Sequence, residues 1–117
     1  MNYGTYMHYL FEVTDFKNPK TDNKQVLDFI KKLDLNCKIY KEYEFEYEQD
    51  NVSYHGIIDL MLVYDDHIDI IDYKLKNITD ENYIKQLSGY KAYIENKLNK
   101  KTSTYLYSII DNNLLEI

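Results

Sequence analysis

Two runs of strand-forming residues separated by only two residues are the feature that most limits how this sequence can fold. The runs cover residues 54–64 and 67–74 and are rich in isoleucine and tyrosine. The two-residue connection Asp65-Asp66 predicts a tight antiparallel hairpin, in which the last residue of the first run pairs with the first residue of the second. This register predicts four cross-strand pairs on one face, namely Val63 with Ile68, Met61 with Ile70, Asp59 with Asp72, and Ile57 with Lys74.

The predicted register places two acidic side chains directly opposite each other. Because strand residues alternate between faces, an apolar patch ends in Asp59 and Asp72, with Lys74 two residues beyond. Opposed Cβ atoms lie roughly 5 Å apart, where like charges are unfavourable. A shared proton, the Lys74 ammonium group or a divalent cation would relieve the repulsion, and Mg²⁺ commonly binds one or two carboxylates together with water and phosphates. The pattern predicts either a site for metal-assisted phosphodiester hydrolysis or a solvated ion cluster at an exposed strand end.

The rest of the chain alternates helical and strand patterns around this hairpin. Apolar spacing predicts helices over residues 5–16, 23–33 and 80–98, and strands over 41–48, 102–110 and 114–117, the last one short. Asp22 is the expected N-cap of the second helix, with Gln25 as its capping-box partner, and Thr79 is expected to open the third helix. The order ααβββαβ(β) predicts the α/β class with a mixed sheet.

Two of these segments have clear faces. In strand 41–48, Tyr43, Phe45 and Tyr47 alternate with four glutamates. The glutamates, which include Glu42, are expected to form a solvated row on the other face of the strand. The third helix has an apolar stripe formed by Tyr83, Leu87, Tyr90, Ile94 and Leu98. Lys97, with Lys100 and Lys101, forms either a small phosphate-contacting cluster or the solvated end of the helix.

Composition narrows the class of protein. With 117 residues, 44% of them hydrophobic, the chain is expected to form a single domain over residues 1–117. No apolar run approaches the ~20 residues of a membrane span, and the lone Cys37 excludes a four-cysteine iron–sulfur cluster, so a cytoplasmic location is expected. The net charge is −6, and all 14 basic residues are lysines. Such a surface by itself argues against tight binding of nucleic acid.

Several short motifs follow one another in an order that is typical of one family of enzymes. They are Gly4-Thr5 followed by His8 and Glu12, then Gly56-Ile57-Ile58-Asp59, Asp72-Tyr73-Lys74, and Tyr83-Ile84-Lys85-Gln86-Leu87-Ser88-Gly89-Tyr90. Lys41-Glu42-Tyr43-Glu44-Phe45, with a glutamate ahead of an aromatic residue, and Tyr105-Leu106-Tyr107-Ser108 are similar to strands of that family. From Gly4 to about Ser108, the sequence resembles the nuclease domains of the RecB/AddA branch of the PD-(D/E)XK superfamily.

The resemblance implies a restriction-endonuclease-like fold, a mixed sheet flanked by helices, and it implies roles by position. Asp59 and Asp72 would hold Mg²⁺ or Mn²⁺, with the backbone carbonyl of Tyr73 as a further ligand. Lys74 would position or help to deprotonate the attacking water, and His8 would be an additional metal ligand or a phosphate contact. Gln86 and Tyr90, one turn apart on the third helix, would support the site or touch the substrate backbone.

The resulting hypothesis is a metal-dependent nuclease acting on DNA, with endonuclease or exonuclease action, and DNA or RNA preference, left open. One alternative is a catalytically weak or inactive nuclease-like module that binds DNA or a protein partner, which the acidic charge favours. Another is an α/β interaction domain whose carboxylates bind a structural cation. Because the chain has little room for a DNA clamp of its own, a second copy of the chain, a helicase or another protein is an expected partner.

Overall fold

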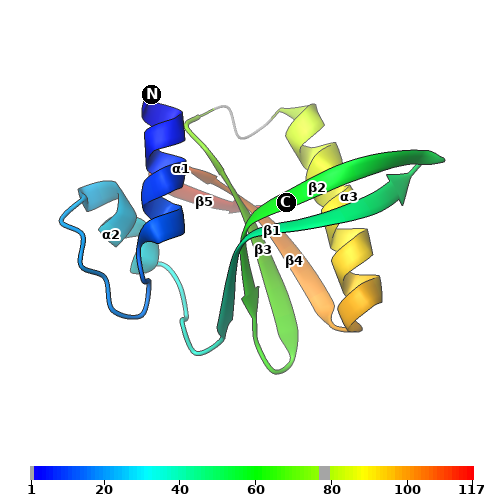
Figure 1. Ribbon diagram of the computed structural model, residues 1–117, viewed down its shortest axis with the longest axis horizontal. Coiled ribbons are helices and arrows are strands. Elements are labelled where there is room, and N and C mark those ends of the chain that lie inside the picture. The colour runs from blue at the N-terminus through cyan, green and yellow to red at the C-terminus, as the bar shows by residue number, and fades with distance from the viewer. Residues whose placement is uncertain (1, 77–79) are drawn as a thin grey trace.

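The computed structural model describes residues 2–76 and 80–117, and a five-stranded mixed sheet forms its centre (Figure 1). The strands are β1 (Lys38–Gln49), β2 (Val52–Val63), β3 (His67–Lys74), β4 (Lys101–Ser108) and β5 (Asn113–Glu116), arranged in that order across the sheet. The helices are α1 (Tyr3–Val13), α2 (Lys24–Ile30) and α3 (Glu81–Leu98). β3 and β4 run parallel, whereas the other neighbouring strands are antiparallel. The predicted α/β class with a mixed sheet is confirmed.

The β2–β3 hairpin forms in the predicted register. The backbone N–H of Tyr64 donates to the carbonyl of His67 at 2.9 Å across the two-residue turn. Beyond the turn, the ladder pairs Val63 with Ile68 and Met61 with Ile70. The two-residue connection therefore determines which residues of these strands lie opposite each other.

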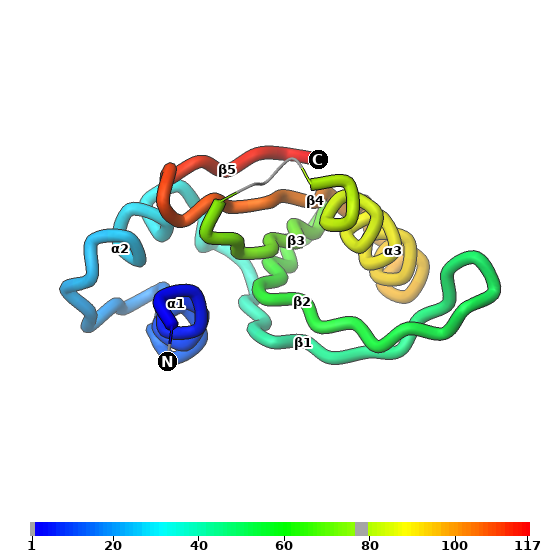
Figure 2. The backbone as a smooth tube through the Cα atoms, turned by 90° about the horizontal axis from the view of Figure 1, so that it is seen from above, coloured from blue at the N-terminus to red at the C-terminus, as the bar shows by residue number. Residues whose placement is uncertain are grey.

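Both faces of the sheet are covered. Figure 2 shows α1 and α2 on one side of the sheet and α3 on the other. Along β3 the side chains alternate between the two layers, so that Ile68 and Ile70 pack with α3, whereas Ile71 and Tyr73 pack with α1 and α2. Burial on both faces explains why β2 and β3 have nearly continuous apolar runs rather than a strict alternation with polar residues.

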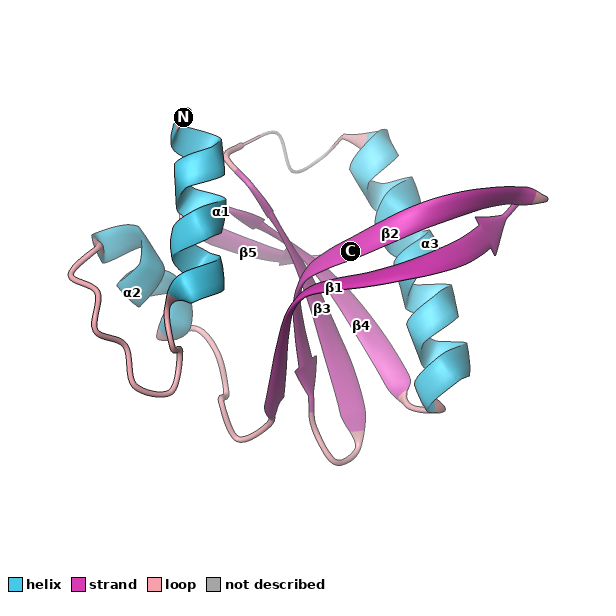
Figure 3. Cartoon of the chain, viewed as in Figure 1, coloured by secondary structure: helices cyan, strands magenta, loops and turns pink. Residues whose placement is uncertain are grey.

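The long β1–β2 hairpin bends where Glu42 faces Asp59. The ladder between the two strands is regular on either side of this pair but skips it, and Glu42 has a left-handed φ of 50°. Past the bend, the two strands continue as an arm that extends beside α3 (Figure 3). An irregular residue of this kind locally disrupts the ladder and bends the strand.

The bend overturns one detail of the predicted faces. Ile58, not Ile57, packs with Met61 against α3, and Ile57 is 41% exposed. The expectation that Ile57 lies on the same buried face as Met61 is therefore wrong. Strict alternation fails between Ile58 and Leu60, which pack on opposite faces of the sheet although they are two residues apart.

The helices begin and end at slightly different residues from those predicted. α1 ends at Val13 because the next residue, Thr14, has an extended backbone, while its hydroxyl and N–H both cap the carbonyl of Leu10. Asn23, not Asp22, is the N-cap of α2, and its side chain accepts the N–H of Val26. Asp80 caps α3, and the predicted cap Thr79 lies outside the described residues. Within the described part of the chain, each helix is too short or too polar to cross a bilayer.

Replacing Gly56 with alanine is expected to destabilise the hairpin arm. A Cβ at this position would lie 2.6 Å from Cζ of Phe45, whose ring is held between Tyr93 at 4.6 Å and Tyr90 at 5.2 Å between centroids. Overpacking of this kind typically costs about 1–3 kcal/mol. Urea denaturation should show this decrease in the free energy of unfolding for Gly56→Ala, whereas the exposed Ser53→Ala on the same strand should match wild type. Equal stability of the two variants would contradict the close packing of Phe45.

Candidate active site

Asp59 of β2 and Asp72 of β3 lie side by side where the two strands stop pairing. The ladder ends with Leu60 opposite Ile71, one residue short of the acidic pair. The backbone N–H of Tyr73, the residue after Asp72, donates to Asp59 Oδ2 at 2.8 Å and so holds Asp59 beside Asp72. Their residues are only 9% and 7% exposed. The alternative of a solvated ion cluster at an exposed strand end therefore does not apply to this pair.

Burial and mutual repulsion determine the charge of the pair. Burial, followed by the charge of Asp72, raises the pKa of Asp59 well above its ordinary value. Asp59 therefore keeps its proton to a higher pH than an ordinary aspartate does. Within the described residues, Asp72 Oδ2 is buried and has no hydrogen-bond partner. The group that the structure places against this oxygen is the ammonium group of Lys74.

Lys74 lies at the end of β3 and faces the same site. Its ammonium nitrogen is 3.1 Å from Asp72 Oδ2, a close ion pair without the directional geometry of a hydrogen bond. On the other side, the ammonium group lies 4.1 Å from the centroid of the Tyr83 ring, which α3 supplies. The cation–π contact and the ion pair together hold the ammonium group between the sheet and α3.

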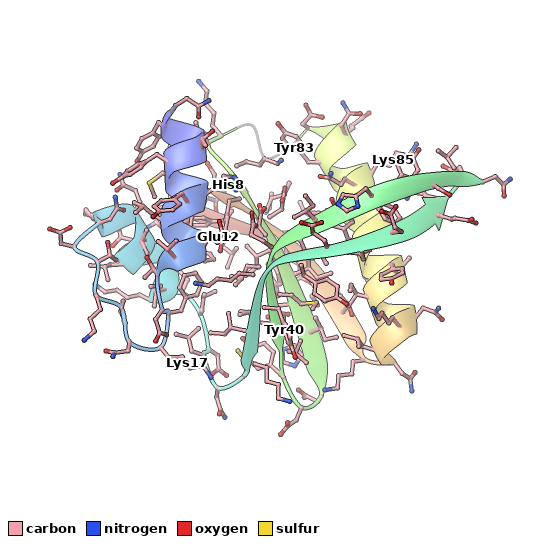
Figure 4. The ribbon with its side chains drawn as sticks, in the orientation of Figure 1. His8, Glu12, Lys17, Tyr40, Tyr83 and Lys85 are labelled. Carbon is pink, nitrogen blue, oxygen red and sulfur yellow. The ribbon has the colours of Figure 1, made fainter. Side chains whose placement is uncertain are left out.

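α1 brings His8 to the acidic pair from the opposite side of the site. His8 Nδ1 is 3.6 Å from Asp59 Oδ1, and its ring packs edge-on against Tyr73 at 5.5 Å between centroids. Figure 4 shows His8 and Glu12, one turn apart, on the side of α1 that faces the strands. The three predicted residues His8, Asp59 and Asp72 are thus brought together from three different elements.

Glu42 belongs to the site, although the alternating pattern of residues 41–48 predicts that it lies in a solvated row. Its side chain is half-buried near Asp59, and burial, followed by the charge of Glu12, raises its pKa. The exposed Glu44 and Glu46 of the same row instead contact His55 on the outside of the arm. The motif of a glutamate ahead of an aromatic residue could have indicated Glu42 as a site residue. The left-handed φ of Glu42, however, cannot be predicted from the sequence.

The two predicted residues of α3 differ in their surroundings. Tyr90 is buried, and its hydroxyl accepts the N–H of Ile57 at 3.3 Å, so it supports β2 two residues before Asp59. Gln86 is exposed and lines a hollow beside the hairpin arm. Within the part of the chain that the structure describes, Gln86 makes no hydrogen bond with the acidic pair.

Lys97 is held near the other end of α3, away from the acidic pair. Its ammonium group donates to the hydroxyl of Tyr43 at 3.0 Å and lies 5.6 Å from the ring of Tyr93. Lys100 donates to the carbonyl of Tyr64 at 2.8 Å. These lysines therefore stabilise strand and helix ends, and a phosphate-contacting role for Lys97 stays a prediction.

The donor set at the acidic pair suits a hard divalent cation. Among the described residues, no group of three histidine, cysteine, aspartate or glutamate side chains is gathered closely enough to enclose a metal ion. Mg²⁺ and Mn²⁺ sites do not require such a cage, since one or two carboxylates with water and substrate phosphates suffice. Asp59 and Asp72 supply two carboxylates, and among the described residues Asp72 Oδ2 accepts no hydrogen bond, so this oxygen can serve as a ligand.

Comparison with known proteins points to one kind of relative. No protein-family model matches the chain. Residues of the chain are 32% identical over 87 positions to an ATP-dependent helicase/nuclease subunit of Thermoanaerobacter sp. (strain X514), and equally to that of Thermoanaerobacter pseudethanolicus. The corresponding protein of Ligilactobacillus salivarius is 34% identical over 79 positions.

The similarity covers much of this chain but little of each relative. It includes 68% of the chain and 7% of the Thermoanaerobacter proteins, and 63% of the chain and 6% of the Ligilactobacillus protein. These relatives are of the AddA type, so the comparison agrees with the predicted resemblance to the RecB/AddA branch. Over about two thirds of its length, the chain is similar to a small part of the AddA-type subunit of an ATP-dependent helicase/nuclease.

Proposed function

We propose that the chain is a metal-dependent nuclease that hydrolyses phosphodiester bonds of DNA and has a restriction-endonuclease-like PD-(D/E)XK fold. The observation that carries this proposal is the buried Asp59–Asp72 pair with the ammonium group of Lys74 at 3.1 Å. Two carboxyl groups buried together weaken a fold unless a proton or a cation neutralises them, and such arrangements cluster at functional sites. The similarity to proteins named as helicase/nuclease subunits supports the same proposal.

Asp59, Asp72 and the backbone carbonyl of Tyr73 would hold Mg²⁺ or Mn²⁺. When bound, such a cation lowers the pKa of the attacking water and neutralises charge on the phosphate. The protein itself orients the ligands, because the N–H of Tyr73 fixes Asp59 Oδ2 at 2.8 Å. His8, 3.6 Å from the other oxygen of Asp59, is placed to contact the phosphate or to act as an additional ligand.

Lys74 would act on the attacking water and on the phosphate. Its ammonium group is held between Asp72 and the Tyr83 ring, so its position is set before substrate arrives. A preorganised positive charge stabilises the negative charge that develops on the phosphate in the transition state. The same group can hold the water by a hydrogen bond for in-line attack.

A second candidate function is a catalytically weak or inactive module that binds DNA or a protein. The acidic surface favours it, because the net charge is −6 and Glu44, Glu46 and Glu48 are exposed along the arm. Phosphate contacts normally come from basic surfaces. For either function, a helicase, another protein or a second copy of the chain would supply DNA contacts, which fits the small share of the relatives that the chain spans.

Cleavage of a panel of nucleic acids tests the proposed function. Purified protein is incubated with linear and closed circular DNA, each single- and double-stranded, and with RNA, in Mg²⁺, in Mn²⁺ and in EDTA. We expect cutting of DNA that requires the cation, with the circular substrates separating endonuclease from exonuclease action.

Three results would contradict the proposal in different ways. Absence of cutting with retained DNA binding would favour the inactive module. A melting temperature that rises with the cation, without DNA binding or cleavage, would indicate a structural cation site. Cutting that persists in EDTA would show that the activity does not depend on a metal.

A further inference from the structure

A small cavity lies between the hairpin arm and the beginning of α3. Its volume is about 190 Å³, and it is lined by Tyr47, Gln49, Tyr54, Asn82, Lys85 and Gln86. This is smaller than the ~300–1,000 Å³ of pockets that hold drug-sized ligands, so it suits one planar ring system. We propose that this cavity binds one unpaired base of a single-stranded nucleic-acid substrate, an inference that rests on the nuclease function proposed above.

The aromatic wall of the cavity is rigid and partly open. Tyr47 and Tyr54 stack with ring centroids 5.4 Å apart and an interplanar angle of 23°. Tyr47 is held from behind by an edge contact with Tyr90 at 5.6 Å and by Gly89, where a Cβ would lie 2.7 Å from its ring. Tyr54 remains 37% exposed. Exposed aromatic rings on a fixed support are the platforms on which proteins stack the bases of single strands.

The polar wall offers groups that match the edge of any base. Gln49, Asn82 and Gln86 each carry an amide that both donates and accepts hydrogen bonds. Lys85 is a cation in the same lining, and its nearest acidic partner is Asp50 at 3.8 Å, with both side chains largely exposed. Such an exposed ion pair is weak, so a phosphate can compete for Lys85. Figure 4 shows Lys85 on α3 next to the arm.

The cavity and the carboxylate site share the first turns of α3. Asn82 lines the cavity, and the adjacent Tyr83 holds the ammonium group of Lys74 at 4.1 Å from its ring centroid. Neighbouring helix residues point about 100° apart, so the two sites flank the helix on adjacent sides. We infer that a strand with one base in the cavity can follow α3 towards Lys74.

A paired base does not meet the requirements of this cavity. Inside a duplex, both faces of a base are stacked on neighbouring bases and its Watson–Crick edge is occupied. Only an unpaired base presents a free ring face to Tyr54 and a free edge to the three amides. The cavity thus selects single strands, loops or frayed ends.

Fluorescence anisotropy with a labelled oligothymidylate and a blunt hairpin duplex of similar length tests this inference. The full chain is used, in EDTA and at low salt, so that no strand is cut. We expect tighter binding of the single strand than of the duplex. Tyr54→Ala should weaken single-strand binding about tenfold, because one stacking contact is lost, and Tyr54→Phe should retain the affinity of wild type. Tyr9→Ala, an exposed tyrosine of α1, is the matched control and should bind like wild type.

A second variant keeps the test independent of the fold of the arm. Lys85→Gln changes an exposed side chain and should weaken binding while reducing the salt slope by about one unit. Single-strand affinity that is unchanged in Tyr54→Ala, or an equal loss for the duplex, would overturn the inference. If the protein nevertheless cuts DNA in a cation-dependent way, only the inference about the cavity fails and the proposed nuclease function still holds. Conversely, Tyr54-dependent binding by a protein that cuts no substrate would support the cavity and overturn the nuclease.

Discussion

Replacement of Lys74 by alanine is expected to slow cation-dependent DNA cleavage about 10²- to 10³-fold, the typical effect of removing one preorganised group that stabilises transition-state charge. The ammonium group lies 3.1 Å from Asp72 Oδ2 and 4.1 Å from the ring centroid of Tyr83. It is therefore the positive charge nearest to the oxygens that would hold the cation. Initial rates on the best substrate of the cleavage panel, at saturating Mg²⁺ or Mn²⁺, measure this effect.

Two further variants separate charge from packing. Lys74→Gln keeps most of the aliphatic stem but removes the charge, and it should be nearly as slow as Lys74→Ala. Lys76→Ala removes an exposed lysine two residues along the chain and should cleave at the wild-type rate. Cleavage by Lys74→Ala at the wild-type rate would show that Lys74 has no role in the reaction or that a contaminating nuclease cuts the substrate.

Replacement of Asp59 by asparagine is expected to have opposite effects on activity and on stability. Residues that only hydrogen-bond to a metal ligand typically contribute about 10- to 100-fold to metal affinity or activity. Loss of the proposed carboxylate ligand itself should therefore reduce cleavage more than about 100-fold. In EDTA at neutral pH, the free energy of unfolding should rise by about 1 kcal/mol. The amide oxygen still accepts the N–H of Tyr73, but the buried carboxyl group next to Asp72 is removed.

The difference in the free energy of unfolding between Asp59→Asn and wild type should increase as the pH rises above about 4. Burial raises the pKa of Asp59 in the folded state above the value of about 3.9 for an unfolded chain. From about pH 4 upwards, the folded wild type therefore binds more protons at this site than the unfolded chain, and its stability falls as pH rises. Below about pH 4 the carboxyl group is protonated in both states, so the stability advantage of Asp59→Asn should disappear.

Urea denaturation in EDTA at about pH 3.5 and at pH 7 measures this difference. Asp65→Asn, in the exposed turn between β2 and β3, is the matched control and should follow wild type at both values. An Asp59→Asn protein that is less stable than wild type at pH 7 would contradict the description of Asp59 as a buried carboxyl group in a repulsive pair.

The proximity of the two carboxylates followed from the sequence because it depends on local geometry. A two-residue turn determines the register of its hairpin, and the register in turn determines which residues lie opposite each other. The observed pairs Met61 with Ile70 and Val63 with Ile68 are the predicted ones. The same reasoning could not show that the ladder ends just before Asp59, since a bend that interrupts pairing leaves no mark in the apolar pattern.

Other features depended on contacts between residues distant in the sequence. The backbone of Glu42 has a left-handed φ, and its side chain is half-buried near Asp59 instead of lying in the expected exposed row. Lys97, considered as a phosphate contact, is held by Tyr43, more than fifty residues earlier in the chain. Apolar periodicity describes which way a regular strand or helix faces, and it carries no information on irregular backbone or on distant partners.

The sequence by itself determined the hairpin with its acidic pair and Lys74, the apolar face of α3 and the α/β class, because short-range geometry and periodicity specify them. Only the tertiary structure decided what surrounds the pair. Packing of α1 on the sheet brings His8 to 3.6 Å from Asp59. Packing of α3 against the hairpin arm creates the cavity beside Tyr54. Both depend on how separate elements dock on one another, which is settled by the fit of buried side chains across the whole molecule.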